Sequence, residues 1–126
     1  MPLLTFERSL VLVIDFQARL TPAIAEGEAR MAAARKVLAA ARLLGAPIVA
    51  TEQNPKGLGP TVEGMLAEGE LVLSKMTFSA VEAPGFEAAV PKDRDIVMMG
   101  AETHVCVLQT AIDLRARGRR VCVLAD

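Results

Sequence analysis

Hydrophobic positions in this chain form short continuous runs that alternate with longer segments of helical spacing. Residues 9–16 (Ser-Leu-Val-Leu-Val-Ile-Asp-Phe) are apolar without every-second-residue alternation, which predicts a strand covered on both faces. Residues 28–44 are rich in alanine with apolar positions at helical spacing, and Gly45 and Pro47 follow, as at a helix end. The pattern therefore begins with a buried strand and a helix.

The rest of the chain continues this alternation. Strands are predicted at residues 47–52, 71–75, 95–100 and 120–125. Helices are predicted at residues 61–67, 82–90 and 103–117, the last with Thr103 as its N-cap. Residues 53–60 hold two glycines and two prolines, which predicts a loop.

Strands that alternate with helices favour an α/β fold. Right-handed crossovers build a parallel sheet with helices on both faces, a three-layer α-β-α arrangement. The 126 residues suffice for one domain, and no repeat or linker divides residues 1–126. The chain ends at Asp126 directly after an apolar strand. This end predicts either coverage by a partner subunit or a native sequence that continues further.

Composition and charge narrow the classes of partner. Lys and Arg number 14 against 15 Asp and Glu, a net charge of −1, so the positive field of a nucleic-acid or membrane binder is missing. Aromatic residues make up 3% of the chain, which disfavours base stacking. No apolar run reaches the ~20 residues of a membrane span, and no secretory signal begins the chain. A cytoplasmic protein with reduced cysteines is expected.

Polar residues follow several predicted strands, at the edge where parallel sheets bind ligands. Asp15, Glu52 and Lys75 each end a strand, and Cys106 lies in the first turn of the helix after the fourth strand. The helix dipole and unpaired N–H groups there favour a thiolate. Cys106 is therefore either a reactive nucleophile or a small buried residue. Cys122, in the middle of the last strand, is predicted to be core.

The base for a Cys106 nucleophile is not predicted to be a histidine. His104 is the only histidine, and on a helix its side chain points about 200° away from that of Cys106. It is interpreted as a pocket or interface residue, or as a solvated residue of the helix start. Asp15 and Lys75 remain, as base and electrostatic partner. Spacing leaves open that they form only a buried ion pair or a helix cap.

Three motifs stand at these strand ends in a common order and spacing. They are Val-Leu-Val-Ile-Asp-Phe-Gln at residues 11–17, Ser-Lys-Met-Thr-Phe-Ser at 74–79 and Gly-Ala-Glu-Thr-His-Val-Cys-Val at 100–107. Together they resemble the isochorismatase-like cysteine hydrolase superfamily over nearly the whole chain. Residues 51–61 and 102–110 are similar to the branch called isochorismatase domain-containing proteins.

The resemblance implies a catalytic triad of Cys106, Asp15 and Lys75 and the strand order 3-2-1-4-5. It also implies a cis peptide bond between Ala101 and Glu102. The backbone N–H groups of Glu102 and Cys106 would then form an oxyanion hole. Strand 3 is not beside strand 1 in this order, so the long Lys75 side chain has to reach inward.

A substrate pocket around the triad is also implied. Its expected lining residues are Phe16, Gln17, Phe78, Thr103 and His104. The Asp-x-His metal cluster of the family's nicotinamidases has no counterpart, because residues 52–60 contain no histidine. A metal is therefore not predicted. No organic cofactor is implied either, since the chain has no P-loop. Residues 54–60 are interpreted as a lid, a subunit contact or a plain surface loop.

The resulting hypothesis is a cysteine hydrolase that cleaves a small amide-type C–N bond. Asp15 takes the Cys106 proton, the thiolate attacks the carbonyl, and water hydrolyses the thioester. True isochorismatases usually lack the cysteine, so Cys106 favours this acyl chemistry. Two other hypotheses stay open: a catalytically silent scaffold or binding protein, and a redox-responsive thiol protein. A small-molecule substrate and assembly into a homo-oligomer are expected.

Overall fold

Five parallel strands form the sheet in the computed structural model, which describes residues 4–20, 22, 26–101 and 103–124. The strands are β1 (Ser9–Ile14), β2 (Ile48–Gln53), β3 (Leu71–Lys75), β4 (Asp95–Gly100) and β5 (Val121–Val123). They pair in the order β3-β2-β1-β4-β5, and every pairing is parallel. The expected strand order is confirmed.

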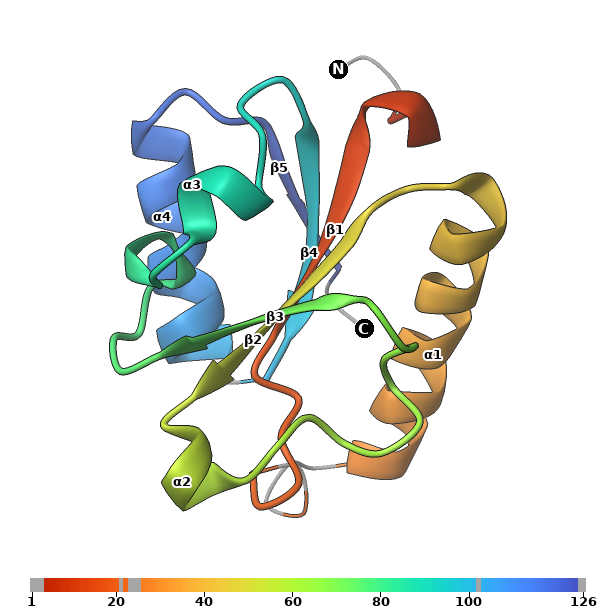
Figure 1. The fold of residues 1–126 in the computed structure, drawn as a ribbon, viewed down its shortest axis with the longest axis vertical. Helices are drawn as coiled ribbons and strands as arrows, with labels where there is room; N and C mark the ends of the chain where they lie inside the picture. The colour runs from red at the N-terminus through yellow and green to blue at the C-terminus, as the bar shows by residue number, and fades with distance from the viewer. Residues whose placement is uncertain (1–3, 21, 23–25, 102, 125–126) are drawn as a thin grey trace.

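Helices cover both faces of this sheet (Figure 1). One face carries α1 (Gly27–Leu44), and the other carries α3 (Phe86–Ala89) and α4 (Leu108–Ala116). Shorter elements are η1 (Phe6–Arg8), α2 (Pro55–Leu58), η3 (Ala80–Glu82) and the π-helix η4 (Thr103–Val107). In the described part of the chain, no helix has the length and hydrophobicity that a membrane span requires.

The central strand β1 shows why its apolar run is continuous. Leu10, Leu12 and Ile14 pack into the core on the α3 and α4 side. Val11 and Val13 pack into the core on the α1 side. All five side chains are nearly or completely buried, as expected for a parallel strand with a helical layer on each face.

The connection between β2 and β3 differs from the prediction. Residues 61–67 form turns instead of a helix, and Gly64 adopts a left-handed conformation with a φ of 81°. This conformation interrupts a helix. The predicted loop at residues 53–60 contains the short helix α2, which begins at Pro55. Proline suits a first helical position because its missing N–H has no partner there in any helix.

The later predicted helices are also shorter than expected. Residues 82–90 hold the end of η3 and the short α3, because Gly85 has a φ of 87° and separates them. The helix predicted at residues 103–117 begins as the π-helix η4 and ends at Ala116. Strand β5 occupies three of the five predicted positions that the structure describes.

A side-chain ion pair ties α1 to the segment that precedes β3. Arg42 Nε donates to Glu70 Oε2 at 2.8 Å and its Nη2 donates to Oε1 at 2.7 Å. The Ala67 N–H also donates to Glu70 Oε1, at 2.8 Å. The hydrogen bond from Arg42 lowers the pKa of Glu70. The pair therefore stabilises the fold where the Glu70 carboxylate is ionised.

Replacing Glu70 by Gln is expected to lower the free energy of unfolding by about 1 kcal/mol at pH 7. Because the folded state lowers the pKa of Glu70, this difference is present above the unfolded-state pKa and disappears as the pH falls below ~4. Urea unfolding at pH 7 and pH 3 measures it. Glu87→Gln is the control, since its pair with Arg117 at 2.6 Å is 59% and 49% exposed; an equal loss in the control would contradict the prediction.

Candidate active site

Asp15 leaves β1 in a left-handed backbone conformation with a φ of 56°. Strand alternation would direct its side chain to the α1 face and that of Phe16 to the opposite face. The positive φ breaks this alternation: the Asp15 carboxylate contacts Lys75 and Thr51, whereas Phe16 packs in the core on the α1 side. Aspartate adopts this conformation more readily than most residues. The turn therefore brings a buried carboxylate to the face that holds Cys106.

Lys75 forms a completely buried ion pair with Asp15. Its Nζ lies 3.0 Å from Asp15 Oδ2, and both side chains are 0% exposed. Nζ also donates to Gln53 Oε1 at 2.6 Å and to the carbonyl oxygens of Thr77 and Phe78, each at 3.0 Å. Burial of two charges costs several kcal/mol per ion unless other hydrogen bonds compensate. The lysine thus reaches across β2 from β3, as its place in the strand order requires.

Thr51 and Gln53 complete the surroundings of the ion pair. The Thr51 hydroxyl donates to Asp15 Oδ1 at 2.8 Å, and Gln53 accepts from Lys75. Both stand on β2 on either side of Glu52, so alternation places them on one face and Glu52 on the other. Glu52 accepts hydrogen bonds from Thr61 instead, at 2.7 and 2.8 Å. Thr51 and Gln53 were not identified from the sequence. The two-residue period of β2 could have identified them, because it places both side chains on the sheet face that carries Lys75.

Cys106 lies in the π-helix η4 and is 3% exposed. Burial, together with the hydrogen bond and charge of Asp15, raises the pKa of Cys106 to about 12, although the charge of Lys75 opposes this shift. The expectation of a thiolate favoured by the helix start is therefore wrong, because desolvation and the carboxylate outweigh the helix dipole. The structure presents a protonated thiol beside a carboxylate and an ammonium group.

The hydroxyl of Thr110 holds the π-helix of Cys106 against the segment that follows β3. Thr110 Oγ1 donates to the Cys106 carbonyl at 2.7 Å and accepts from the Ala80 N–H at 2.8 Å. Thr110 is itself 0% exposed. This contact fixes the backbone of the nucleophile candidate relative to the Lys75 side of the site.

The expected pocket residues have different positions in the structure. Gln17 is 0% exposed. Its Nε2 donates to the carbonyl oxygens of Gln53 and Gly59, at 3.0 and 2.7 Å, and its Oε1 accepts from the Gln53 N–H at 2.7 Å. It holds the loop of residues 54–60 in place, which disfavours a mobile lid. Phe78 is 58% exposed and contacts the site through its carbonyl oxygen. Phe16, in the α1-side core, is not brought together with the triad.

Part of the predicted site lies outside the described residues. Glu102, its expected cis bond to Ala101 and its share of the oxyanion hole belong to this part. Thr103 and His104 stand in η4, but their side chains are not among those described. Within the described residues, no group of three or more His, Cys, Asp and Glu is placed to hold a metal ion.

The chain matches a known protein family in sequence. Residues 9–126 match the family model of the isochorismatase domain. Isochorismatase domain-containing protein 1 of Danio rerio is 44% identical over 122 residues, which cover 94% of this chain and 43% of the relative. Isochorismatase domain-containing protein 2A of Mus musculus is 40% identical over 121 residues, 95% of this chain and 59% of the relative. The chain spans about half the length of the curated relatives it matches.

Solved structures share its fold. A structure named MAR1 ribonuclease from Caenorhabditis elegans has a TM-score of 0.86 and 38% identity, and the match covers 93% of this chain and 62% of that one. An isochorismatase structure from Pseudomonas putida has a TM-score of 0.84, with coverage of 98% and 72%. At 22% identity, the second likeness shows the fold alone.

Titration of Cys106 is expected to depend on both charged neighbours. In a background with Cys122 replaced by Ser, Asp15→Asn lowers the pKa of Cys106 and Lys75→Met raises it, since the carboxylate raises and the ammonium lowers this pKa. Thiolate absorbance and iodoacetamide labelling, both followed against pH, measure the shift. A thiol that neither variant shifts would show that the three groups do not interact. A parent thiol that titrates below the free value of ~8.5 would contradict the raised pKa and show that Lys75 outweighs burial and Asp15.

Gly100→Ala is expected to disturb the site from β4. A Cβ at Gly100 would overlap the carbonyl oxygen and Cβ of Ile14, the residue before Asp15. The strands must separate, at a cost of about 1–3 kcal/mol, and Cys106 labelling should become faster. Gly118→Ala is the control, because its positive φ of 76° strains the backbone but no atom lies within 4 Å of the added Cβ. Faster labelling in Gly118→Ala alone would contradict this account.

Proposed function

This chain belongs to the isochorismatase family, in the branch of the isochorismatase domain-containing proteins, and from that premise we propose that it is a cysteine hydrolase. Its substrate is a small molecule with an amide-type C–N bond. The observation that carries the proposal is the buried Asp15–Lys75 pair beside the Cys106 thiol. Cysteine and an adjacent base are the pair that nucleophilic acyl transfer needs.

In the first half of the reaction, Asp15 acts as the base. It accepts the thiol proton as the Cys106 sulfur attacks the substrate carbonyl carbon and the C=O electron pair moves to oxygen. The raised pKa of Cys106 means that the proton leaves during attack, not beforehand. The C–N bond then breaks, and Asp15 returns the proton to the leaving nitrogen. The products of this half are an amine and a thioester on Cys106.

In the second half, water replaces the amine. Asp15 takes a proton from water as the oxygen attacks the thioester carbonyl, the C–S bond breaks, and the sulfur recovers that proton. One water is consumed for each C–N bond cleaved. The same carboxylate serves twice because it faces the same sulfur in both halves.

Lys75 acts as a fixed positive charge and not as an acid. The three protons of its ammonium group are shared among four acceptors, Asp15, Gln53, Thr77 and Phe78. Its protons are therefore directed at groups of the protein itself. Its charge instead favours the ionised sulfur, because it lowers the pKa of Cys106 against the effect of Asp15.

The oxyanion is proposed to accept hydrogen bonds from the backbone N–H groups of Cys106 and Glu102. Hydrogen bonds of a π-helix run from residue i to residue i−5, so an N–H in the first turn of η4 (Thr103–Val107) has no acceptor inside the helix. The Cys106 N–H is one of these donors. Glu102 lies outside the described residues, and its part rests on the family resemblance.

The redox alternative finds no support at this site. Oxidation needs an exposed thiol with thiolate character, whereas Cys106 is 3% exposed and burial raises its pKa. The name ribonuclease belongs to the C. elegans relative. The net charge of −1 does not favour a ribonuclease here, and RNA therefore enters the test below as a competing substrate.

Location and assembly are proposals as well. Cys106 and Cys122 are free thiols, which supports a cytoplasmic location. Exposed apolar side chains on and after the edge strand β3, Leu71, Val72, Met76 and Phe78, support a homo-oligomer.

Ammonia release from a panel of small primary carboxamides tests the proposed reaction. We expect Asp15→Asn to lower turnover about 10²–10⁴-fold and Cys106→Ser to abolish it, with a thioester on Cys106 visible by intact mass in the parent. Cys122→Ser is the matched control and should keep the parental rate, because this cysteine lies on β5.

Three outcomes would overturn the proposal. Amide cleavage that survives Cys106→Ser would exclude the thioester. Cleavage of a single-stranded RNA without cleavage of any amide would favour a nuclease, and binding of an amide without its cleavage would favour a silent family member.

A further inference from the structure

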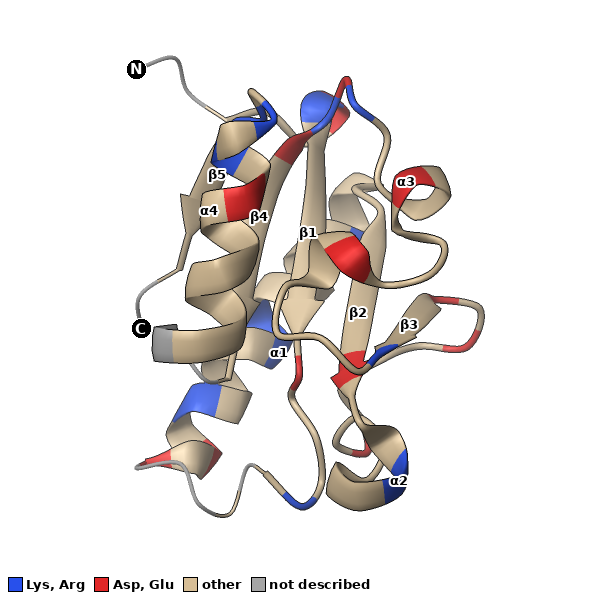
Figure 2. Cartoon of the chain, turned by 90° about the vertical axis from the view of Figure 1, so that its left-hand side faces the viewer, with Lys and Arg blue, Asp and Glu red and all other residues tan. Residues whose placement is uncertain are grey.

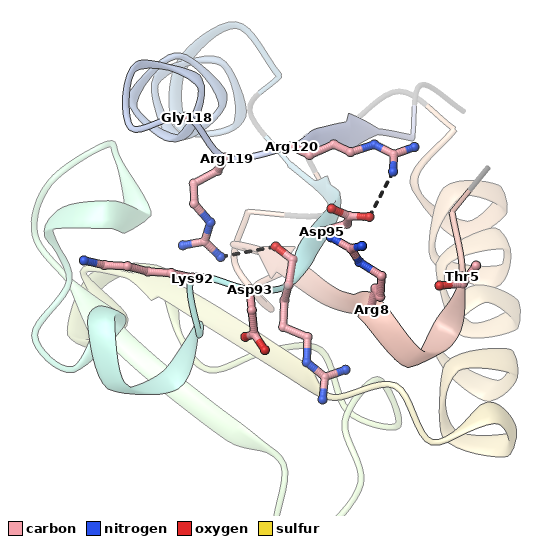
Figure 3. Close-up of a pocket in the computed structure, with 9 residues that line it drawn as sticks. Thr5, Arg8, Lys92, Asp93, Asp95, Gly118, Arg119 and Arg120 are labelled. Carbon is pink, nitrogen blue, oxygen red and sulfur yellow. Dashed lines mark hydrogen bonds and ion pairs between the residues drawn. The ribbon is translucent and has the colours of Figure 1, made fainter. Parts of the chain in front are cut away.

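A cavity of about 560 Å³ lies at the end of the sheet away from the triad. Figure 3 shows its walls, which come from η1 before β1, the turn before β4 and the connection from α4 to β5. These segments precede the N-terminal ends of their strands, whereas Asp15 and Lys75 stand at the carboxyl ends. The cavity therefore shares no residue with the proposed active site.

The cavity concentrates positive charge. Five cationic residues line it, Arg8, Lys92, Arg94, Arg119 and Arg120, against the acidic Asp93 and Asp95. Their local formal charge of +3 contrasts with a net charge of −1 for the whole chain. Figure 2 shows several Lys and Arg at this end of the molecule, beside the start of β1 and β4, with Asp and Glu among them.

Arg119 is a buried cation that has no carboxylate partner among the described residues. It is 7% exposed, and its guanidinium donates only to backbone carbonyls, of Pro91 at 2.6 Å and more weakly of Val90 and Arg94 at 3.5 and 3.4 Å. In the part of the chain that the structure describes, its buried Nε has no hydrogen-bond partner. Carbonyl dipoles offset only part of the cost of burying a full charge. An anion in the adjacent cavity would supply the missing negative charge.

The other charges leave room for such an anion. Asp95 is engaged by Arg120, whose Nη1 lies 3.1 Å from Oδ2. Arg94 donates to two carbonyl oxygens of the η1–β1 segment. Among the residues that the structure describes, the side chains of Arg8 and Lys92 have no hydrogen-bond or ion-pair partner. Arg8 is therefore available to contact a ligand directly.

We propose that this cavity binds a small molecule that carries a phosphate group. Guanidinium groups match the geometry of phosphate oxygens and donate to them in pairs. The volume of about 560 Å³ falls within the range of small-molecule sites, roughly 300–1,000 Å³. A nucleic-acid strand would need positive charge along an extended surface, whereas the excess here is local. The inference does not rest on the proposed hydrolase activity.

Calorimetric titration of the purified protein with inorganic pyrophosphate, in chloride buffer of constant ionic strength, tests the site. We expect saturable binding of one pyrophosphate per chain. Arg8→Gln should weaken it about tenfold, since one charge-assisted contact is lost, and Arg8→Gln with Lys92→Gln should weaken it further. Both side chains are exposed, so the variants should melt like the parent protein.

Controls locate the bound anion. Lys36→Gln removes an exposed positive charge on α1 and should leave the affinity unchanged, as should Cys106→Ser. Absence of saturable binding, equal weakening by Lys36→Gln, or loss of binding in Cys106→Ser would each overturn the proposal. Displacement of pyrophosphate by a single-stranded RNA of much higher affinity would also overturn it, in favour of a polyanion surface.

Discussion

The buried ion pair between Asp15 and Lys75 is the interaction on which the arrangement of the site depends. Two opposite charges with fully covered side chains persist only where every remaining donor and acceptor is used. Thr51 and Gln53 on β2 meet this need, together with two carbonyls after β3. The order β3-β2-β1 places β2, which carries Thr51 and Gln53, between the strands that carry the two charges. The strand order therefore determines which polar groups surround the ion pair.

The same ion pair determines the state of the nucleophile candidate. The carboxylate and burial keep the proton on Cys106, and the ammonium limits this effect. The helix start, which taken alone favours a thiolate, is the weaker influence in this buried site. The two ends of the sheet therefore differ in electrostatics. Charges at the carboxyl end are paired and enclosed, whereas the cavity at the other end holds an excess of positive charge around Arg119.

Patterns of the chain predicted the elements that depend on local periodicity. The continuous run of β1 and the spacing of α1 both correspond to faces that the structure buries. Residues 61–67 were mispredicted because a left-handed Gly64 overrides their helical pattern. Phe16 packs in the core on the α1 side for a related reason. The left-handed Asp15 reverses the alternation that would have placed it on the site face.

The sequence by itself determined the α/β class, the strand order through its family resemblance, and Asp15, Lys75 and Cys106 as the groups to consider. It could do so because strand and helix periods are local and because strand ends of a parallel sheet meet at one edge. Only the tertiary structure decided that Lys75 reaches Asp15, that Thr51 and Gln53 support them, and that the thiol stays protonated. Distances across three strands and the exclusion of water arise only when the whole sheet is packed, so no local pattern contains them.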